Sequence, residues 1–493
     1  MQVISSEDIL ERVRSENPWW ESDRATSEAH RKMKRRPYFD LFYPLLTQSV
    51  RRAIVLMGPR RVGKTVMIYH AVQKLIDDGI PPQAICYFSV DHPIYNGLSL
   101  EKLLEYYGQA SGVNYKLDDV FVFFDEIQYL RNWEIHLKSA VDTYSKIKFI
   151  ASSSAAAALR LKSTESGAGR FTDFLLPPLT FHEYLYLLDK TNLVEVLPPK
   201  EHRKGETTFF ETKNIEELNE RFISYLNFGG YPEVILSPTI QADPARFIKS
   251  DIIDKVLLRD LPSLYGISEI QELNYLFTTL AFNTANEISL GELSVNSGVA
   301  KNTIKRYIEY LEAAFLIKIV HRVDHNAKRF RRANFFKIYL TNPSMRAALL
   351  SPIKKDDSAV GSLTETAVFS QWFHSTNVNL YYARWQDGEV DIVNLNQQRQ
   401  KPLWAVEVKW SDRYCDHPDE LKSLVSFCNA NGLKNTLVTS MTRNIFCEQD
   451  GVKIEFVPAS LYCYTVGHNL VRRKFQDEPL RAKIASDEAE SEG

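Results

Sequence analysis

The chain from residue 51 to about residue 185 alternates short apolar runs with longer amphipathic runs. The apolar runs have the length and composition of strands and lie at 53–57, 85–90, 120–124, 147–152 and 171–176. The runs with helical spacing lie at 64–78, 99–111 and 133–144. Repeated strand–helix units predict an α/β fold, with a parallel sheet that is covered by helices on both faces. The run Val120–Phe124 is apolar throughout, which is typical of a strand buried on both faces.

The next region, roughly 186–350, is mainly helical by its pattern. Within it, residues 288–311 read as a short helix, a glycine-bearing turn and an amphipathic second helix, which is typical of a helix-turn-helix. Residues 316–322 and 335–340 are the expected wing strands. The candidate DNA-contacting residues are Lys301, Asn302, Lys305 and Arg306 on the second helix and the basic run Lys328, Arg329, Arg331 and Arg332 on the wing. Winged helices also serve as lids or dimerisation modules, so both interpretations stay open.

Near the C-terminal end, apolar and polar residues alternate with a period of two residues, as in strands. Residues 388–395 and 403–410 read as two strands of a hairpin, joined by a turn-rich stretch. Because alternate residues of a strand share a face, Glu407 and Lys409 lie on one face, and Val406 and Val408 lie on the other. The last stretch, 474–493, is charged and poor in large apolar residues, and we expect a disordered tail there.

Composition places the chain among ordinary globular proteins. Of 493 residues, 44% are hydrophobic and 25% charged, and the net charge of −2 excludes a globally basic nucleic-acid binder. The five cysteines show no metal-ligand spacing and are odd in number, so they read as reduced thiols. No apolar run reaches the roughly 18 residues of a membrane span, and the N-terminus has no signal-peptide pattern. We therefore expect a cytoplasmic location and no membrane partner.

The first candidate site follows the strand 53–57 directly. A glycine-rich loop that opens a helix is the context of a phosphate-binding P-loop, whose backbone N–H groups cradle phosphate. Lys64 is expected to reach the β/γ-phosphate oxygens, and the Thr65 hydroxyl to ligate Mg²⁺. The helix N-terminus adds a positive field at the same point. The predicted nucleotide-binding residues are Gly58, Pro59, Arg60, Arg61, Val62, Gly63, Lys64, Thr65 and Val66.

Acidic and polar residues follow two further strands of the predicted sheet. Asp125 is placed to hold the Mg²⁺ shell, and Glu126 is the natural base for the water that attacks the γ-phosphate. The serines 152–154 end another strand; a helix cap is one interpretation, and the resemblance to ATPases given below implies the other, a polar residue that senses the γ-phosphate. Arg170 follows a glycine-bearing stretch and is a candidate arginine finger, in cis or in trans, with an ordinary ion pair as the alternative. The cofactors predicted here are ATP and Mg²⁺.

A second constellation lies on the C-terminal hairpin. Two carboxylates and a lysine on one sheet face are costly to bury without a partner, and a divalent ion supplies one. Asp391 and Glu407 are the predicted Mg²⁺ ligands, Glu365 on an upstream helix is a third candidate, and Lys409 orients the attacking water at a phosphodiester. The alternative is an exposed Glu-x-Lys ion pair on an edge strand.

These motifs resemble two known families. Gly58–Thr65, Phe124–Trp133 and the Gly169–Tyr184 segment resemble prokaryotic AAA-superfamily ATPases of the additional-strand type. Asp391, Glu407 and Lys409 resemble the restriction-endonuclease-like PD-(D/E)XK superfamily. The chain departs from these patterns at Ala151, where the ATPases have Thr-Gly before the serines, and at Val390, which replaces the proline of the nuclease motif.

The resemblance implies an organisation and a function for the whole chain. The expected parts are an N-terminal lead-in (1–50), a P-loop ATPase domain (51–200), a helical and winged-helix region (201–350), an α/β restriction-endonuclease-like domain (351–473) and the tail (474–493). The implied function is an ATPase that controls Mg²⁺-dependent cleavage of nucleic acid, DNA or RNA with DNA favoured, and this pairing is compatible with defence against foreign nucleic acid. One alternative is a regulatory switch ATPase that binds a partner or nucleic acid without cleavage. Another is a DNA motor, which requires assembly into a homo-oligomer.

Overall fold

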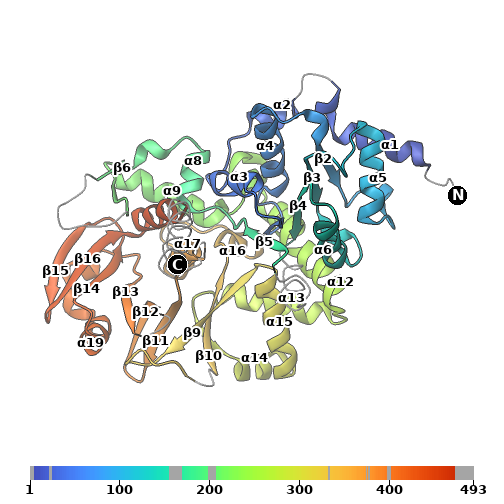
Figure 1. Ribbon diagram of the computed structural model, residues 1–493. Helices are drawn as coiled ribbons and strands as arrows, with labels where there is room; N and C mark the ends of the chain where they lie inside the picture. Colours follow the sequence, from blue (N-terminus) through green and yellow to red (C-terminus); the bar gives the residue numbers. More distant parts are fainter. Residues whose placement is uncertain are drawn as a thin grey trace, which may run out of the picture. The chain divides into compact units, whose positions relative to one another are not determined.

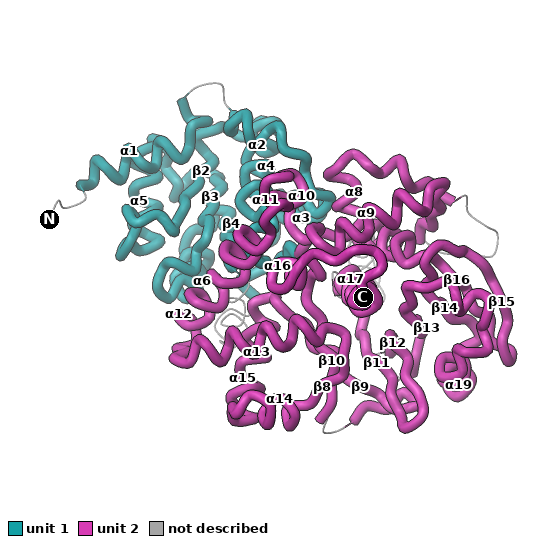
Figure 2. Tube along the Cα trace, turned by 180° about the vertical axis from the view of Figure 1, so that it is seen from behind, with its two compact units in different colours: residues 1–177 teal, residues 178–493 magenta. Residues whose placement is uncertain are grey.

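The computed structural model describes residues 5–21, 25–154, 169–197, 207–330, 334–373, 375, 378–396 and 401–471. It divides into two compact units, residues 1–177 and residues 178–493 (Figure 2). No helix among these residues has both the length and the apolar character that crossing a membrane requires. The predicted tail, 474–493, lies outside the described residues, as do Arg331, Arg332 and residues 155–168.

Unit 1 is built on a five-stranded parallel sheet with the strand order β2-β3-β4-β1-β5. The strands are β1 (Ala53–Gly58), β2 (Ile85–Ser89), β3 (Val120–Asp125), β4 (Ile147–Ser154) and β5 (Phe171–Leu175). The main helices are α1 (Ser6–Glu16), α2 (Glu28–Lys32), α3 (Phe39–Thr47), α4 (Lys64–Asp77), α5 (Leu100–Ser111) and α6 (Trp133–Thr143) (Figure 1). Strand β4 lies between β3 and β1, as the additional-strand type requires, and the predicted α/β class is confirmed.

The apolar runs form strands because both faces of the sheet are buried. All six residues of β1 are buried, and alternate ones, Ala53, Val55 and Met57, pack in one core with α1, α5 and α6. The predicted strand positions therefore agree with the observed ones to within about two residues, since burial on both faces leaves no room for polar residues inside the strands.

The predicted lead-in is part of unit 1 and covers the free edge of its sheet. Ile9 and Val13 of α1 are buried in the same core as the sheet. The Asn17 amide makes a two-way contact with β2, donating to Tyr87 O (2.9 Å) and accepting from Tyr87 N (2.7 Å). The Trp19 indole donates to Ile85 O at 3.0 Å. These side chains satisfy backbone groups that an edge strand otherwise leaves open.

Unit 2 contains a helical region followed by a mixed sheet of nine strands (Figure 1). The helical region comprises α8 (Phe181–Leu187), α9 (Ile215–Phe228), α10 (Pro232–Leu236), α11 (Pro238–Ala242), the π-helical turns η8 (Ala245–Asp254) and η9 (Val256–Asp260), α12 (Leu261–Tyr265), α13 (Ile270–Phe282), α14 (Leu290–Ser297), α15 (Lys301–Ala313) and α16 (Ser344–Leu349). A small sheet of two strands, β6 (Glu195–Val196) and β7 (Phe210–Glu211), lies in the same unit.

The nine strands have the order β15-β16-β14-β13-β12-β11-β9-β10-β8. They are β8 (Glu287–Ser289), β9 (Ile317–Val323), β10 (Phe335–Leu340), β11 (Leu380–Trp385), β12 (Gly388–Leu395), β13 (Pro402–Glu407), β14 (Asn435–Ser440), β15 (Ile445–Gln449) and β16 (Val452–Pro458). The helices beside this sheet are α17 (Val360–Trp372), α18 (Arg413–Asp416), α19 (Lys422–Asn431) and a last helix whose described part covers 459–471.

The sheet runs without a break across residue 350, where the sequence predicts a domain boundary. Strand β9, an expected wing strand, pairs in parallel with β11 of the C-terminal region, with Tyr381 opposite His321. The structure thus joins the helical region and the C-terminal region in one unit, and it ends the first unit at 177 rather than at 200. Backbone pairing between segments far apart in sequence leaves no trace in local composition, which explains the difference.

Candidate functional sites

The predicted phosphate-binding loop leads from the carboxyl end of β1 into α4. Gly58 has no space for a side chain, because a Cβ atom there would lie 2.2 Å from Leu176 O. Gly63 has a φ of +95°, a conformation that glycine adopts readily, and α4 begins at the next residue. The predicted residues 58–66 therefore form one tight loop and the first turn of a helix, the arrangement that binds phosphate.

Lys64 is held inside this loop. Its Nζ donates to Gly58 O and Pro59 O, both at 3.0 Å, and the residue is only 5% exposed. The loop backbone thus keeps a positive charge beside the N-terminus of α4, where the helix dipole also favours an anion.

Asp125 lies at the carboxyl end of β3 and is contacted from three strands or helices. Thr65 Oγ1 donates to its Oδ2 at 2.7 Å, Tyr87 OH donates to the same oxygen at 2.9 Å, and Ser152 Oγ donates to Oδ1. Burial raises the pKa of Asp125, and repulsion from Glu126 adds to this effect. A hydroxyl and a carboxylate in contact beside the loop lysine fit the Mg²⁺ of a bound nucleotide, which would favour the ionised carboxylate.

Glu126 follows Asp125 in a strained backbone conformation. Its φ is +55°, which is uncommon for a residue with a side chain. Its amide donates to Ser152 Oγ at 2.9 Å, and its carboxylate accepts a hydrogen bond from Gln128. Unusual backbone conformations of this kind are common at functional sites, where surrounding contacts maintain them. Here the contacts from Ser152 and Gln128 maintain the conformation of Glu126.

Ser152 orients both acidic residues, because its hydroxyl donates to the Asp125 carboxylate and accepts from the amide of Glu126. Sequence reasoning singled out Ser152 but missed Tyr87 and Gln128. Gln128 also accepts from the Ser154 amide at 3.2 Å and so links the ends of β3 and β4. No local pattern marks Tyr87, since its role depends on β2 lying next to β3.

Arg170 does not belong to the ATP site of its own chain, which corrects the cis interpretation. Its carbonyl accepts from Ala53 N at the amino end of β1, and its side chain pairs with Asp142 at 2.9 Å. The strands are parallel, the loop leaves the carboxyl end of β1, and Phe171 pairs with Ala53, so Arg170 lies about 20 Å from Gly58 along the sheet. A role in trans stays a prediction.

The second candidate site is in unit 2, where the hairpin of β12 and β13 brings Asp391 and Glu407 together. Asp391 Oδ2 and Glu407 Oε1 both face the Lys409 ammonium, at 3.7 and 2.7 Å. Asp391 Oδ2 also accepts from Val408 N at 2.8 Å. Thr439 of β14 fixes the backbone of Lys409 with two hydrogen bonds of 2.7 Å. The two carboxylates therefore share the Lys409 ammonium as their positive partner.

Glu365 belongs to the same group of charged side chains, but a different lysine contacts it. We call this group the carboxylate cluster; its members are Lys337, Glu365, Glu389, Asp391, Glu407 and Lys409. Glu365 is the only charged residue of α17, and its Oε1 accepts from Lys337 Nζ at 2.9 Å and from Tyr339 OH at 2.6 Å. Lys337 also contacts Glu389 at 2.6 Å and Asp391 at 3.7 Å.

The predicted set of three metal ligands is therefore not assembled. Within the described ranges, no three His, Cys, Asp or Glu side chains are grouped so that they could hold a metal ion. The physical reason is that Lys337 lies between Glu365 and Asp391, and Lys409 lies between Asp391 and Glu407. Burial raises the pKa of Glu365 to about 7 and that of Glu407 to about 8, and repulsion from Asp391 contributes to both.

Sequence reasoning missed Lys337 and Glu389, although each left a signal. Lys337 interrupts an otherwise apolar strand, β10. Glu389 stands two residues before Asp391 and therefore shares its face of β12.

Two consecutive helices, α14 and α15, form where the sequence predicts a helix-turn-helix, and β10 pairs with β8 and with β9 in the same unit. The buried face of α15 carries Ile304, Tyr307, Ile308 and Leu311. Lys301, Asn302, Lys305 and Arg306 are all exposed, away from that face. The Arg329 guanidinium stacks over the ring of Tyr381 at 4.7 Å.

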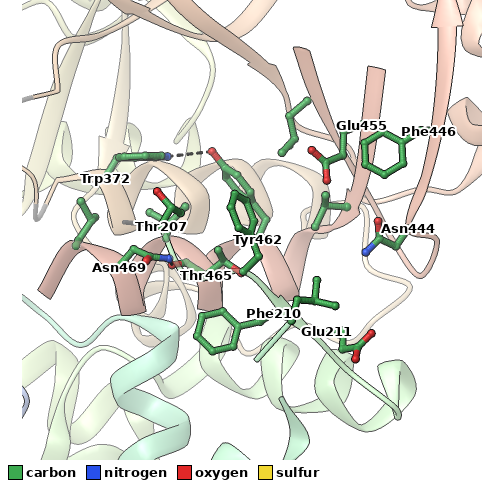
Figure 3. Close-up of a pocket in the computed structure, with 16 residues that line it drawn as sticks. Thr207, Phe210, Glu211, Trp372, Asn444, Phe446, Glu455, Tyr462, Thr465 and Asn469 are labelled. Atoms are coloured by element: carbon green, nitrogen blue, oxygen red, sulfur yellow. Dashed lines mark hydrogen bonds between the residues drawn. The ribbon is translucent and has the colours of Figure 1, made fainter. Parts of the chain in front are cut away.

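A cavity of about 390 Å³ lies elsewhere in unit 2, between β7, the β14–β16 strands and the last helix (Figure 3). Its walls are largely apolar, and at one side Trp372 Nε1 lies 3.3 Å from Tyr462 OH. The lining residues that the structure describes include none of the carboxylates or lysines of the cluster above, so the two features are separate.

The fold and the site of unit 1 define an AAA-type P-loop ATPase domain. Residues 50–185 match the family described as an AAA domain, in agreement with this assignment. Residues 219–356 and 360–462 match two domains of unknown function, DUF8612 and DUF4143. The DUF4143 match includes every residue of the carboxylate cluster except Lys337. The description of that family names no activity.

The similar proteins match over most of the chain, but their names state no activity. Two uncharacterized proteins of Methanocaldococcus jannaschii, MJ1544 and MJ1637, are 24% identical over 354 residues and 26% identical over 325 residues. The matches cover 70% and 64% of this chain, and 73% and 66% of the relatives. A structure of Hsp104 of S. cerevisiae in complex with casein is 17% identical with a TM-score of 0.29, over 55% of this chain and 50% of that chain. At that TM-score the likeness carries no weight.

Proposed function

We propose that the protein hydrolyses ATP in unit 1 and that its C-terminal carboxylate cluster is a Mg²⁺-dependent site for cleaving nucleic acid, DNA rather than RNA. The contact between Thr65 and Asp125, with Lys64 in the loop beside it, carries the ATPase part of the proposal. The convergence of Asp391 and Glu407 on one ammonium group carries the cleavage part.

In the ATPase site, the loop amides and Lys64 bind and orient the triphosphate. Thr65 and Asp125 would hold Mg²⁺, which when bound would neutralise charge at the phosphates. Glu126 accepts a proton from the attacking water; Ser152 holds its backbone amide at the end of β3, and Gln128 donates to its carboxylate. Lys64→Ala should abolish nucleotide binding, and a variant that still binds and hydrolyses ATP at the wild-type rate would contradict this part.

In the carboxylate cluster, Asp391 and Glu407 would hold one Mg²⁺, which supplies Lewis-acid activation of a phosphodiester. Lys409 lies beside both carboxylates and orients the attacking water. The order of helices and strands from α13 to β10 supports a winged helix, and the basic residues of α15 support its contact with DNA. Metal-dependent cleavage of duplex DNA that is lost in Asp391→Ala would support the proposal, and cleavage that Asp391→Ala leaves unchanged would refute it.

A second candidate function is a regulatory ATPase whose C-terminal site binds without cutting. The observation that favours it is the pairing of the carboxylates with Lys337 and Lys409, which satisfies much of their charge without a metal ion. The two candidates differ in one test. If Lys64→Ala abolishes biological function while Lys409→Ala preserves it, the site does not cut.

We further place the protein in the cytoplasm, since its five cysteines are all free thiols. Assembly into a homo-oligomer, with Arg170 acting on a neighbouring subunit, belongs to the same proposal.

A further inference from the structure

Arg36 is an arginine buried against the phosphate-binding loop of unit 1. It ends a basic run, 31–36, whose other members are all exposed, yet Arg36 itself is only 6% exposed. Its Nη1 donates to Val62 O of the loop and to Pro177 O, both at 2.9 Å. A buried charge is costly unless its hydrogen bonds are made, so a guanidinium that is enclosed here and contacts two backbone carbonyls indicates a specific role.

The contact with Val62 orients the next peptide group of the loop. None of the described peptide bonds is cis. In a trans peptide group the carbonyl and the following N–H point in opposite directions. A hydrogen bond that holds Val62 O toward Arg36 therefore turns the N–H of Gly63 away from Arg36. Gly63 directly precedes α4, where the open N–H groups of the helix N-terminus favour an anion.

The backbone around Val62 needs such support. Both of its neighbours have a positive φ, +65° for Arg61 and +95° for Gly63. Glycine adopts this conformation readily, but it is uncommon for a residue with a side chain, such as Arg61. A conformation of this kind persists only where surrounding contacts maintain it, and the Arg36 guanidinium contacts the peptide group between the two residues.

The contact with Pro177 ties the loop to a fixed part of the sheet. Leu176 N donates to Met57 O at 2.7 Å, so the segment after β5 is held against the end of β1. Because one nitrogen of Arg36 binds both carbonyls, a shift of Val62 would break a contact with a segment that is itself held in place.

We propose that Arg36 is a positioning residue for phosphate binding, which holds Val62 O so that the Gly63 N–H is directed at the phosphates of the nucleotide. The inference rests on the proposed ATPase function and adds to it a residue that does not touch the nucleotide. Its effect should depend on the phosphate groups of the ligand and not on the adenosine.

The test compares the full chain in wild type, Arg36→Met and Arg36→Lys. Isothermal titration calorimetry measures the binding of ATP and of inorganic tripolyphosphate, each with Mg²⁺. Methionine is unbranched and has no donor. We expect Arg36→Met to weaken both ligands by the same factor, roughly 10- to 100-fold, the value of one hydrogen bond to a charged group. Arg36→Lys keeps the charge but is one bond shorter, so its loss should be smaller and again equal for the two ligands.

Arg35→Met is the matched control. Arg35 is the neighbouring residue in the same basic run, but it is exposed, and its guanidinium lies over the ring of Phe39, 4.7 Å from the centre. This variant removes one positive charge near the loop without removing a contact to Val62, and it should bind both ligands as wild type does.

Hydrolysis separates a positioning role from a merely structural one. The loop amides bind the phosphates both before and during the reaction, so in Arg36→Met the KM for ATP should rise by the same factor as the dissociation constant, while kcat changes by less than about threefold. A purely structural defect would reduce the fraction of active protein, and therefore kcat, without changing KM.

Equal affinity of wild type and Arg36→Met for tripolyphosphate overturns the proposal, and so does a loss for ATP that tripolyphosphate does not share. If wild type binds neither ligand, the proposed ATPase function fails as well. If Arg36→Met does not fold, Arg36→Lys decides. A loss shared by both ligands supports the proposal, whereas unchanged affinity overturns it, because the position would then need only a buried cation and not the contact with both carbonyls.

Discussion

The affinity of the carboxylate cluster for a divalent ion should depend steeply on pH, because of Glu407. Burial raises the pKa of Glu407 to about 8 from an ordinary value of 4.5, and Asp391 adds repulsion that Lys409 only partly offsets. A metal ion binds the ionised carboxylate, so it must displace the proton that Glu407 carries at lower pH. Metal binding should therefore strengthen as the pH rises.

The size of this effect follows from the pKa. With a pKa of about 8, Glu407 is about 3% ionised at about pH 6.5 and about 76% ionised at about pH 8.5. The apparent affinity for Mg²⁺ should rise by roughly one order of magnitude over this interval, which corresponds to roughly 1–2 kcal/mol. Without metal, the free energy of unfolding should change in the opposite direction and fall as the pH rises. Because the folded-state pKa is raised, the stabilisation from the bound proton is complete below about pH 4.5 and is lost as the pH rises through about 8.

The assay is a titration of the nucleotide-free chain with Mg²⁺ at both pH values, read from the increase in melting temperature. The rise caused by Mg²⁺ should be larger at the higher pH, while the melting temperature in EDTA should be lower there. Glu407→Gln is the matched control, since glutamine cannot ionise and should remove the pH dependence. Equal affinity at both pH values, or a pH dependence that persists in Glu407→Gln, would refute the reasoning.

Three further predictions concern unit 1. Glu126→Gln should slow ATP hydrolysis by roughly 10²–10⁴-fold and preserve nucleotide binding, as measured by phosphate release and by a fluorescent nucleotide; an unchanged rate would remove Glu126 as the base. Gly58→Ala should abolish nucleotide binding and lower the melting temperature, because the added Cβ would lie 2.2 Å from Leu176 O; normal binding would show that the loop has room to shift. Asn17→Ala should lower the free energy of unfolding by about 2–3 kcal/mol in denaturant titration, since it leaves two backbone groups of Tyr87 without partners, and a loss below about 0.5 kcal/mol would show that water replaces the amide.

The ATPase sheet could be predicted from sequence because its strands are buried on both faces. An uninterrupted apolar run such as Val120–Phe124 is typical of a strand inside a parallel sheet, and its acidic end marks the edge of the sheet where ligands bind. Lys64 and Thr65 are predicted from a glycine-rich loop between a strand and a helix, and Asp125 from the end of an apolar strand; the structure joins Thr65 and Asp125 by a hydrogen bond. The glycine-bearing stretch before Arg170 does not reveal that β5 runs parallel to β1, and this direction puts Arg170 at the amino end of the sheet.

The C-terminal site was predicted less completely, since its residues come from four separate elements. The hairpin pattern was enough to join Asp391 and Glu407, which are near in sequence. Lys337 lies more than fifty residues before Asp391, and only the pairing of β9 with β11 brings its strand into the same sheet. A contact that depends on this pairing has no signal within a local window of sequence.

That pairing has a practical consequence for anyone who dissects the chain. A fragment beginning at residue 351 would lose β8, β9 and β10, and with them the neighbour that satisfies one whole side of β11. The bared backbone would act as a template for cross-pairing between copies, and such material would precipitate or give misleading measurements. Fragments intended to isolate the carboxylate cluster should therefore start near residue 178, where unit 2 begins.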